Sequence, residues 1–401
     1  MTGVSQPVID VIRSFGLLGV TAFGGPTAHL GYFREEFVSR RRWLSERSYA
    51  DIVAVAQFLP GPASSQVGMA LGYHRAGWMG MLAAWVMFTA PSAILLAAFG
   101  LLMNALGIDA DQGWIKGLLA AAVAVVFHAV SGMAKTMANT KVTATIAVLA
   151  GLIVLAVPSP FTHIAVIIAA GVLGVVALRD SLADAADEDP EPEPIRAVSA
   201  RAATISLVAF FVLLGGLALA ATTVGGYLLT RLAAYFQAGS LVFGGGHVVL
   251  PLLQAEVVPP GWLDDQTFIA GYGAAQAVPG PLFTFAAYLG AAMRPGVAGV
   301  ATGLLALAAV FLPSFLLLIG VLPFWDRLRA QASVQAALRG VNAAVVGLLL
   351  AALYEPVWTS AVRGAPDLAL GLAAFLLLAV WRWPAWAVVL LSAVVGAFAL
   401  G

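Results

Sequence analysis

Long apolar stretches separated by short polar turns fill most of this chain. Nine of them approach the length of a helix that crosses a ~30 Å hydrocarbon core at ~1.5 Å per residue. Because these runs are continuous and do not alternate with polar residues, they predict helices and disfavour a β-barrel. The nine stretches are 76–103, 114–133, 142–157, 161–178, 202–223, 296–322, 334–354, 368–380 and 385–400. The stretch 368–380 is short and needs its flanking residues to span the membrane.

Two kinds of interruption break the apolar pattern, and each occurs twice. The first half has Phe23-Gly24-Gly25-Pro26 and then Gln57-Phe58-Leu59-Pro60-Gly61-Pro62. The second half has Phe243-Gly244-Gly245-Gly246 and then Gln276-Ala277-Val278-Pro279-Gly280-Pro281, about 220 residues later in each case. Matched Gly/Pro interruptions in the two halves are typical of a transporter whose binding site lies where two repeats meet.

The matched series predicts an all-α polytopic membrane protein with two inverted-topology repeats. The expected boundaries are an N-terminal repeat at 1–178, a linker at 179–201, a connecting transmembrane helix at 202–225 and a C-terminal repeat at 226–401. The linker is acidic and proline-rich, so we expect a solvated cytoplasmic tether. Each repeat is expected to begin with two re-entrant, broken helical hairpins, among them 6–36, 48–74 and 226–258, followed by transmembrane helices.

Basic residues indicate that the two repeats have opposite orientations. A Trp-Leu loop follows the first interruption of each repeat, at Trp43 and at Trp262. The second loop, 256–265, contains no Lys or Arg, whereas the first is flanked by Arg34, Arg40, Arg41, Arg42 and Arg47. By the positive-inside rule, the first loop is expected in the cytoplasm and the second outside.

Composition further limits the class of protein to which this chain can belong. The chain is 61% hydrophobic and 10% charged, which excludes an ordinary soluble domain. A net charge of zero gives no support for nucleic-acid binding, and the absence of cysteine excludes disulfides and thiolate metal sites. The five histidines lack metal-ligand spacing, so we expect neither a metal nor a cofactor. The first residues do not resemble a cleaved signal peptide.

The interruptions also provide candidate chemistry, because each precedes the start of a new helix. A helix N-terminus offers unpaired N–H groups and roughly half a positive charge, which suits an oxyanion. Close helix packing is the alternative use of such glycines; four breaks in two matched pairs favour a cavity. The predicted substrate-binding residues are Gly24, Gly25, Pro26, Thr27, His29, Pro60, Gly61, Pro62, Ser64, Ser65, Gln66, Gly244, Gly245, Gly246, His247, Pro279, Gly280, Pro281 and Thr284.

Other polar residues near the breaks are candidates for gating or coupling, because ionisable groups within a bilayer are costly and usually functional. They are Glu36, Glu256, Gln57, Gln276, Lys116, Arg339 and Asn342. Glu36 has a simpler alternative role, an ion pair with Arg34 or Arg40. Lys116 and Arg339 either attract an anion or extend to the lipid headgroups. His128 and His163 are interpreted as isolated structural residues.

These residues resemble the chromate ion transporter family in its long, two-domain bacterial form. The resemblance covers most of both halves and rests on the interrupted segments already quoted, together with Arg41-Arg42-Trp43-Leu44-Ser45 and Arg339-Gly340-Val341-Asn342. It implies export of chromate across the inner membrane, driven by the membrane potential or the proton gradient, and hence chromate resistance. Sulfate, of the same charge and shape, is the expected competitor.

Three alternatives stay open at this stage. The first is uptake of sulfate or another oxyanion, and the second is a passive anion channel. The third, a membrane-embedded enzyme, is disfavoured because the chain shows no nucleophile elbow, His/Asp cluster or thiol. The residues themselves indicate only an anion-favouring cavity at a repeat interface, and they do not distinguish a monomer from a homodimer.

Overall fold

The structure is a computed structural model that describes residues 6–106, 112–157, 159–179, 198–243, 246–329 and 331–400. Every regular element in these ranges is a helix, as the continuous apolar runs predict. The acidic part of the predicted linker, including Asp184 and Glu188, lies outside the described residues, as do Gly244 and Gly245.

In the first half, polar caps and prolines define where the helices begin. The Ser45 and Thr140 hydroxyls accept N–H groups in the first turns of α3 and α6, and Pro26 lies in the first turn of α2. The long helix α4 leaves helical geometry at Ala76 and Gly77, so its first part is a separate segment. The elements are α1 Gln6–Thr21, α2 Gly25–Phe33, the π-helix η1 Arg34–Arg40, α3 Glu46–Phe58, α4 Ala63–Leu106, α5 Gly113–Met137, α6 Lys141–Ala156 and α7 Pro160–Leu178.

The second half repeats this order after a connecting helix, α8. Here the helix after the second Pro-Gly-Pro break is split completely, because Met293–Pro295 separates α12 from α13. The elements are α8 Ala200–Thr223, α9 Tyr227–Leu241, η3 Gly246–Val248, α10 Val249–Val257, α11 Asp265–Ala277, η4 Leu282–Thr284, α12 Phe285–Ala292, α13 Gly296–Val321, η5 Leu322–Phe324, α14 Trp325–Arg329, α15 Ala332–Ala352, η6 Leu353–Trp358, α16 Thr359–Ala361, α17 Ala365–Ala379 and α18 Ala385–Ala399.

Six helices in the described ranges are long and apolar enough to cross a membrane. Three of the nine predicted crossings are shorter helices: α6, α17 and α18 have 16, 15 and 15 residues, which corresponds to about 22–24 Å. Thr140 limits α6 as its N-terminal cap, and Pro384 directly precedes α18. Only 11% of the most apolar window of α8 is buried, which suits a helix that faces lipid. The chain is a multi-pass membrane protein.

In each repeat a tryptophan brings the ends of the two broken hairpins together. Arg75 forms a 2.9 Å ion pair with Asp10 of α1, and its guanidinium lies 5.3 Å from the Trp43 ring. In the second repeat, Arg231 of α9 lies 4.2 Å from the Trp262 ring. The start of α1, the Trp43 loop and the end of the first part of α4 are therefore neighbours.

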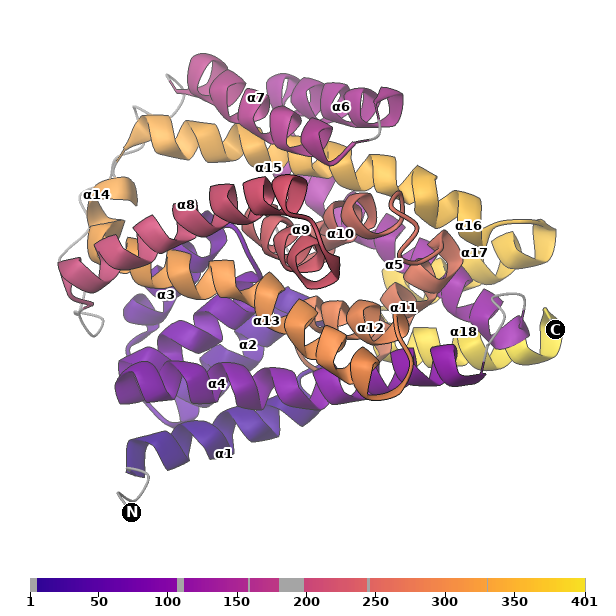
Figure 1. Cartoon of the computed structure of the whole chain (residues 1–401), viewed down its shortest axis with the longest axis horizontal. Coiled ribbons are helices and arrows are strands. Elements are labelled where there is room, and N and C mark those ends of the chain that lie inside the picture. Colours follow the sequence, from indigo (N-terminus) through magenta and orange to yellow (C-terminus); the bar gives the residue numbers. More distant parts are fainter. Residues whose placement is uncertain are drawn as a thin grey trace.

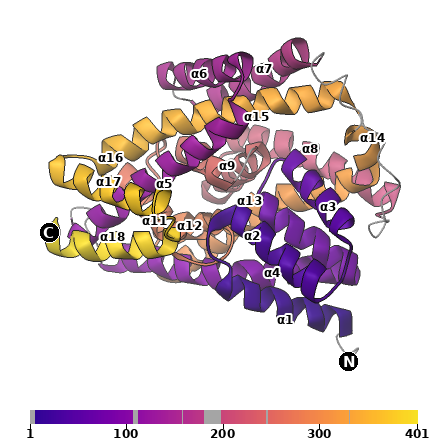
Figure 2. The same cartoon turned by 180° about the vertical axis from the view of Figure 1, so that it is seen from behind.

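The two repeats exchange their last helical hairpins. Figures 1 and 2 both show α6 and α7 of the first repeat lying along α15 of the second. Conversely, α17 and α18 pack on α5 of the first repeat. Glycines allow both approaches: a Cβ on Gly174 would lie 3.0 Å from the Cα of Gly340, and one on Gly396 would lie 2.7 Å from the Cα of Gly117. The repeats are thus interlocked.

Candidate anion-binding site

The four helix breaks adjoin one another, and each Pro-Gly-Pro break bonds to the residue just before the Phe-Gly-Gly break of the other repeat. The N–H of Gly61 donates to the Val242 carbonyl at 2.7 Å. The N–H of Gly280 donates to the Ala22 carbonyl at 2.9 Å. Since Val242 and Ala22 immediately precede Phe243 and Phe23, these two bonds join the repeats in a nearly symmetric way.

Both bonds depend on glycine. Gly61 has φ 125° and Gly280 has φ 98°, conformations that side chains rarely adopt. A Cβ on Gly61 would also collide with the Ser314 hydroxyl, and one on Gly280 would lie 2.8 Å from the Ser92 hydroxyl. Ser314 lies in α13 of the second repeat and Ser92 in α4 of the first, so each glycine contacts a serine of the opposite repeat.

Two cavities lie at this junction, with volumes of about 470 Å³ and 240 Å³. The larger reaches from the first Pro-Gly-Pro break along α5 to Met137, and the smaller reaches from the second break to the turn between α17 and α18. They share four lining residues, namely Pro26, His128, Ala129 and His247.

The lining suits an anion. Neither cavity has an Asp, Glu, Lys or Arg among its described lining residues. Instead, helix starts contribute to the walls through Pro26 of α2, Ala63 of α4, His247 of η3 and Leu282 of η4. Unpaired N–H groups and the positive ends of helix dipoles therefore lie near the cavities, and no carboxylate opposes them.

Many of the predicted residues lie in these walls. Asn342 of α15 and Gln57 line the larger cavity, and Gln276 lines the smaller one. The side-chain amide nitrogen of Gln276 is buried and has no partner in the described part of the chain. The predicted residues that contact either cavity are Gly24, Gly25, Pro26, Gln57, Gly61, His247, Gln276, Gly280 and Asn342.

A second group lies behind the walls and supports the breaks. His29 is 1% exposed; its Nδ1 pairs with the Ser64 hydroxyl at 3.2 Å and its Nε2 with the Ala22 carbonyl at 3.1 Å. The Gln66 amide donates to the Pro60 carbonyl at 2.7 Å, and the Thr284 hydroxyl donates to Pro281 at 2.7 Å. The remaining members outside the linings are Pro62, Ser65, Gly246 and Pro279, while Thr27 is described only as part of α2.

A third group lies away from the cavities. Glu36 forms ion pairs with Arg40, at 3.1 Å, and with Arg41, in line with the simpler alternative for this residue. Its counterpart Glu256 accepts a bond from Gln237 at 2.8 Å, and burial raises the pKa of Glu256 to about 7. Lys116 donates to the Leu400 carbonyl near the end of the chain, and Arg339 is exposed.

One wall of the site was not predicted, the face of α5 that carries His128, Gly132 and Thr136. His128 lines both cavities, so its interpretation as an isolated structural residue is corrected. The three residues lie four apart and so share one face of the helix. A histidine within an otherwise apolar stretch was the available signal, but the pattern alone did not show that it faces a cavity. The turn at Trp383 and Pro384 was missed as well, since it belongs to the exchanged hairpin.

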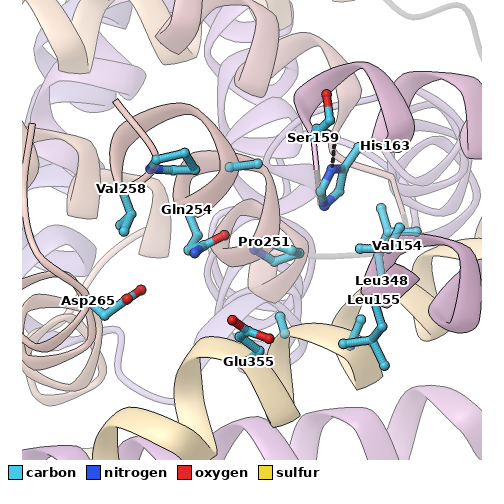
Figure 3. A pocket seen from close by; sticks show the side chains of 14 residues that line it. Val154, Leu155, Ser159, His163, Pro251, Gln254, Val258, Asp265, Leu348 and Glu355 are labelled. Carbon is cyan, nitrogen blue, oxygen red and sulfur yellow. Dashed lines mark hydrogen bonds between the residues drawn. The ribbon is translucent and has the colours of Figure 1, made fainter. Parts of the chain in front are cut away.

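A third cavity, of about 320 Å³, lies apart from the breaks and has a different chemistry (Figure 3). Its lining includes Asp265 and Glu355 on either side of Gln254, together with His163. Two carboxylates without a Lys or Arg among the described lining residues disfavour an anion there. The part of the chain that the structure describes also contains no group of three His, Asp or Glu placed to hold a metal.

Comparison with known proteins places this architecture in a family. The family model described as "Chromate transporter" matches residues 9–175 and again 229–397, so the two halves match as repeats. The chain is 28% identical to a chromate transport protein of Pseudomonas aeruginosa, over 91% of this chain and 85% of the relative. It is 28% identical to a chromate transport protein of Cupriavidus metallidurans over 88% and 83%, and 27% identical to an uncharacterized transporter of Methanocaldococcus jannaschii over 86% and 83%.

No solved structure matches this chain. The family model covers well over half of the residues, and its two matched regions include all four helix breaks. The protein belongs to the chromate transporter family.

Proposed function

We propose that this chain is a secondary transporter that exports chromate across the inner membrane and thereby confers chromate resistance. The observation that carries the proposal is the meeting of four helix starts around cavities without a carboxylate. The names of the Pseudomonas and Cupriavidus relatives support chromate as the anion.

The anion is held chiefly by backbone groups and neutral polar side chains. A dianion that leaves water loses its hydration, so the site must replace those hydrogen bonds with oriented donors. The start of α2, the start of α4 and the side-chain amides of Gln57, Gln276 and Asn342 provide such donors at the cavity walls.

The orientation follows from the distribution of arginines. Arg75 and the Trp43 loop lie together at the end of the molecule that also holds Arg34, Arg40, Arg41, Arg42 and Arg47 near α3. We place that end in the cytoplasm. In the second repeat the equivalent end carries Arg231 and Arg294 near Tyr227, a smaller number of basic residues, and we place it outside.

Counterflow in proteoliposomes tests the proposal. Vesicles loaded with unlabelled chromate are expected to accumulate labelled chromate transiently, because an alternating-access carrier exchanges the two. Vesicles loaded with sulfate show whether sulfate is also a substrate. A passive channel would equilibrate the label without transient accumulation, and the absence of any flux would exclude oxyanion transport.

Direction is tested separately in everted membrane vesicles. An exporter is expected to accumulate chromate in these vesicles when the membrane is energised, and collapse of the proton gradient or of the membrane potential shows which one drives it. Accumulation by right-side-out vesicles instead would establish uptake and contradict export.

A further inference from the structure

Two imidazoles from opposite repeats lie where the two central cavities meet. His128 belongs to α5 and His247 to η3, and each lines both cavities. Both residues therefore belong to the part of the wall that the two cavities share. This position distinguishes them from His29, which is buried behind the wall.

Each ring has a nitrogen that is free to bind a ligand. The Nδ1 of His247 pairs with the Tyr272 hydroxyl at 2.7 Å, and its Nε2 has no hydrogen-bond partner in the described ranges. His128 is exposed, and no hydrogen bond to it occurs among the described residues; its ring faces Phe375 at 6.5 Å. A protonated imidazole carries N–H groups on both nitrogens, so both rings could donate into the cavities.

Few other titratable groups face this pair. From α11 the Tyr272 hydroxyl contacts His247, whereas α2 contributes Pro26 and α17 contributes Phe375. Lys135 and Arg382 neighbour lining residues in sequence, but both are exposed and neither is in the described lining. Among the described lining residues, only His128 and His247 carry an imidazole, the type of side chain that can gain a proton near neutral pH.

A divalent anion in such a cavity requires compensating charge. Helix starts supply roughly half a charge each, but the effect falls off within the first turn, and only three of the four starts line each cavity. We infer that His128 and His247 bind the oxyanion through their ring N–H groups and that the pair takes up protons when the anion binds. This inference rests on the proposed function and assigns its coupling residues.

Sulfate is the appropriate probe, because it stays doubly charged from pH ~6 to pH ~9 and any pH dependence then belongs to the protein. Binding to the purified protein is measured by calorimetry in two buffers that differ in protonation enthalpy, which gives the number of protons taken up per anion. We expect between about half and one proton at pH ~7, and an affinity that falls as pH rises, by close to tenfold per pH unit wherever one proton is taken up per anion. Chromate is measured in parallel above pH ~7.5, where it is also doubly charged.

The variants separate the pair from other histidines. His128→Gln removes no hydrogen bond found in the described ranges, so the variant is expected to fold, to take up about half as many protons and to bind more weakly at pH ~6. The double variant H128Q/H247Q is expected to show no proton uptake and a pH-independent affinity. His163→Gln, in the separate cavity of Figure 3, is the matched control and should behave as wild type.

Three results would overturn the inference. Binding without proton uptake in the wild type would show that helix starts suffice, and the proposed function would stand. Unchanged uptake in the double variant would assign the protons to other groups. If neither sulfate nor chromate binds the wild type at any pH, the proposed function fails together with the inference.

Discussion

After the first Pro-Gly-Pro break the helix continues with Ser64, Ser65 and Gln66, whereas after the second it continues with Phe283, Thr284 and Phe285. The first set is polar and bonds to His29 and Pro60. In the second set, the Phe285 ring lies 5.1 Å from Phe268, 5.8 Å from Tyr272 and 6.0 Å from Tyr288.

The backbone is nevertheless the same at both breaks. Each central glycine has a positive φ and donates its N–H to the opposite repeat. The repeats have thus kept the interlocked backbone and have diverged in the side chains behind it. This comparison suggests that the shared backbone holds the cavity walls, while the polar side chains support the first break and aromatic packing supports the second.

The largest expected effect comes from the shared feature. Gly61→Leu and Gly280→Leu should each reduce chromate transport at least about tenfold, because the side chain is strained at these φ values and collides with Ser314 or Ser92. Transport is measured in everted vesicles after normalisation to inserted protein. Gly215→Leu in α8 is the control, since a Cβ there meets no atom within 4 Å. Wild-type rates in either break variant would show that the interlock is dispensable.

A smaller effect should separate the two breaks. Gln66→Leu leaves the Pro60 carbonyl without its donor, at a cost of about 1–3 kcal/mol, and should lower transport several-fold. Phe285→Leu should lower thermal stability by about 1 kcal/mol, while transport per folded molecule stays near wild type. Thermal midpoints in detergent and vesicle transport are measured for both variants. Equal transport losses in the two would contradict the division of roles.

Paired substitutions, of each break glycine and of the serine that it contacts, also test the difference between the two breaks. In Gly61→Ala the new methyl group meets the Ser314 hydroxyl and lies 2.7 Å from the Gln66 amide nitrogen, the end of a side chain that can move, so Ser314→Ala should restore part of the lost transport. In Gly280→Ala the methyl group also lies 3.1 Å from the Phe88 carbonyl, a backbone atom that no substitution removes. Ser92→Ala should therefore restore less. The measurement is a double-mutant cycle on transport rate, with both serine variants alone as controls.

The sequence predicted the breaks because clusters of Gly and Pro interrupt a helix locally, whereas the isolated Pro91 and Pro313 lie inside α4 and α13. It did not predict that α6 and α7 lie on α15, since Gly174 and Gly340 are like other glycines of membrane helices until a partner is known. The same limit applies to the site. Pro26, Gly61 and Gly280 could be assigned to a wall from local pattern, but His128 could not, because its role depends on which face of α5 meets the other repeat.

Matched sequence positions also differ in their surroundings, and the two glutamates show how. Glu36 has two arginine partners, whereas Glu256 accepts a bond from the neutral Gln237 and has no arginine partner among the described residues. Glu36 is 8% exposed, but Arg40 is largely exposed and Arg41 partly so, so water screens both ion pairs and Glu36→Gln should cost about 1 kcal/mol. Neither Glu36→Gln nor Glu256→Gln should change transport much, because neither side chain lines a central cavity.

Glu256→Gln should behave differently with pH. Burial raises the pKa of Glu256 to about 7, so the folded state holds this proton more tightly than the unfolded state does. The stability that depends on the proton is fully present at low pH and is lost as pH rises through about 7. The variant, which is always neutral, should match wild type at pH ~5 and exceed it at pH ~8 by about 2–4 °C in thermal midpoint. If the difference in thermal midpoint between the variant and wild type were constant from pH ~5 to pH ~8, Glu256 would be as well solvated as an exposed carboxylate. Glu256 and Glu36 would then differ only in their bonding partners.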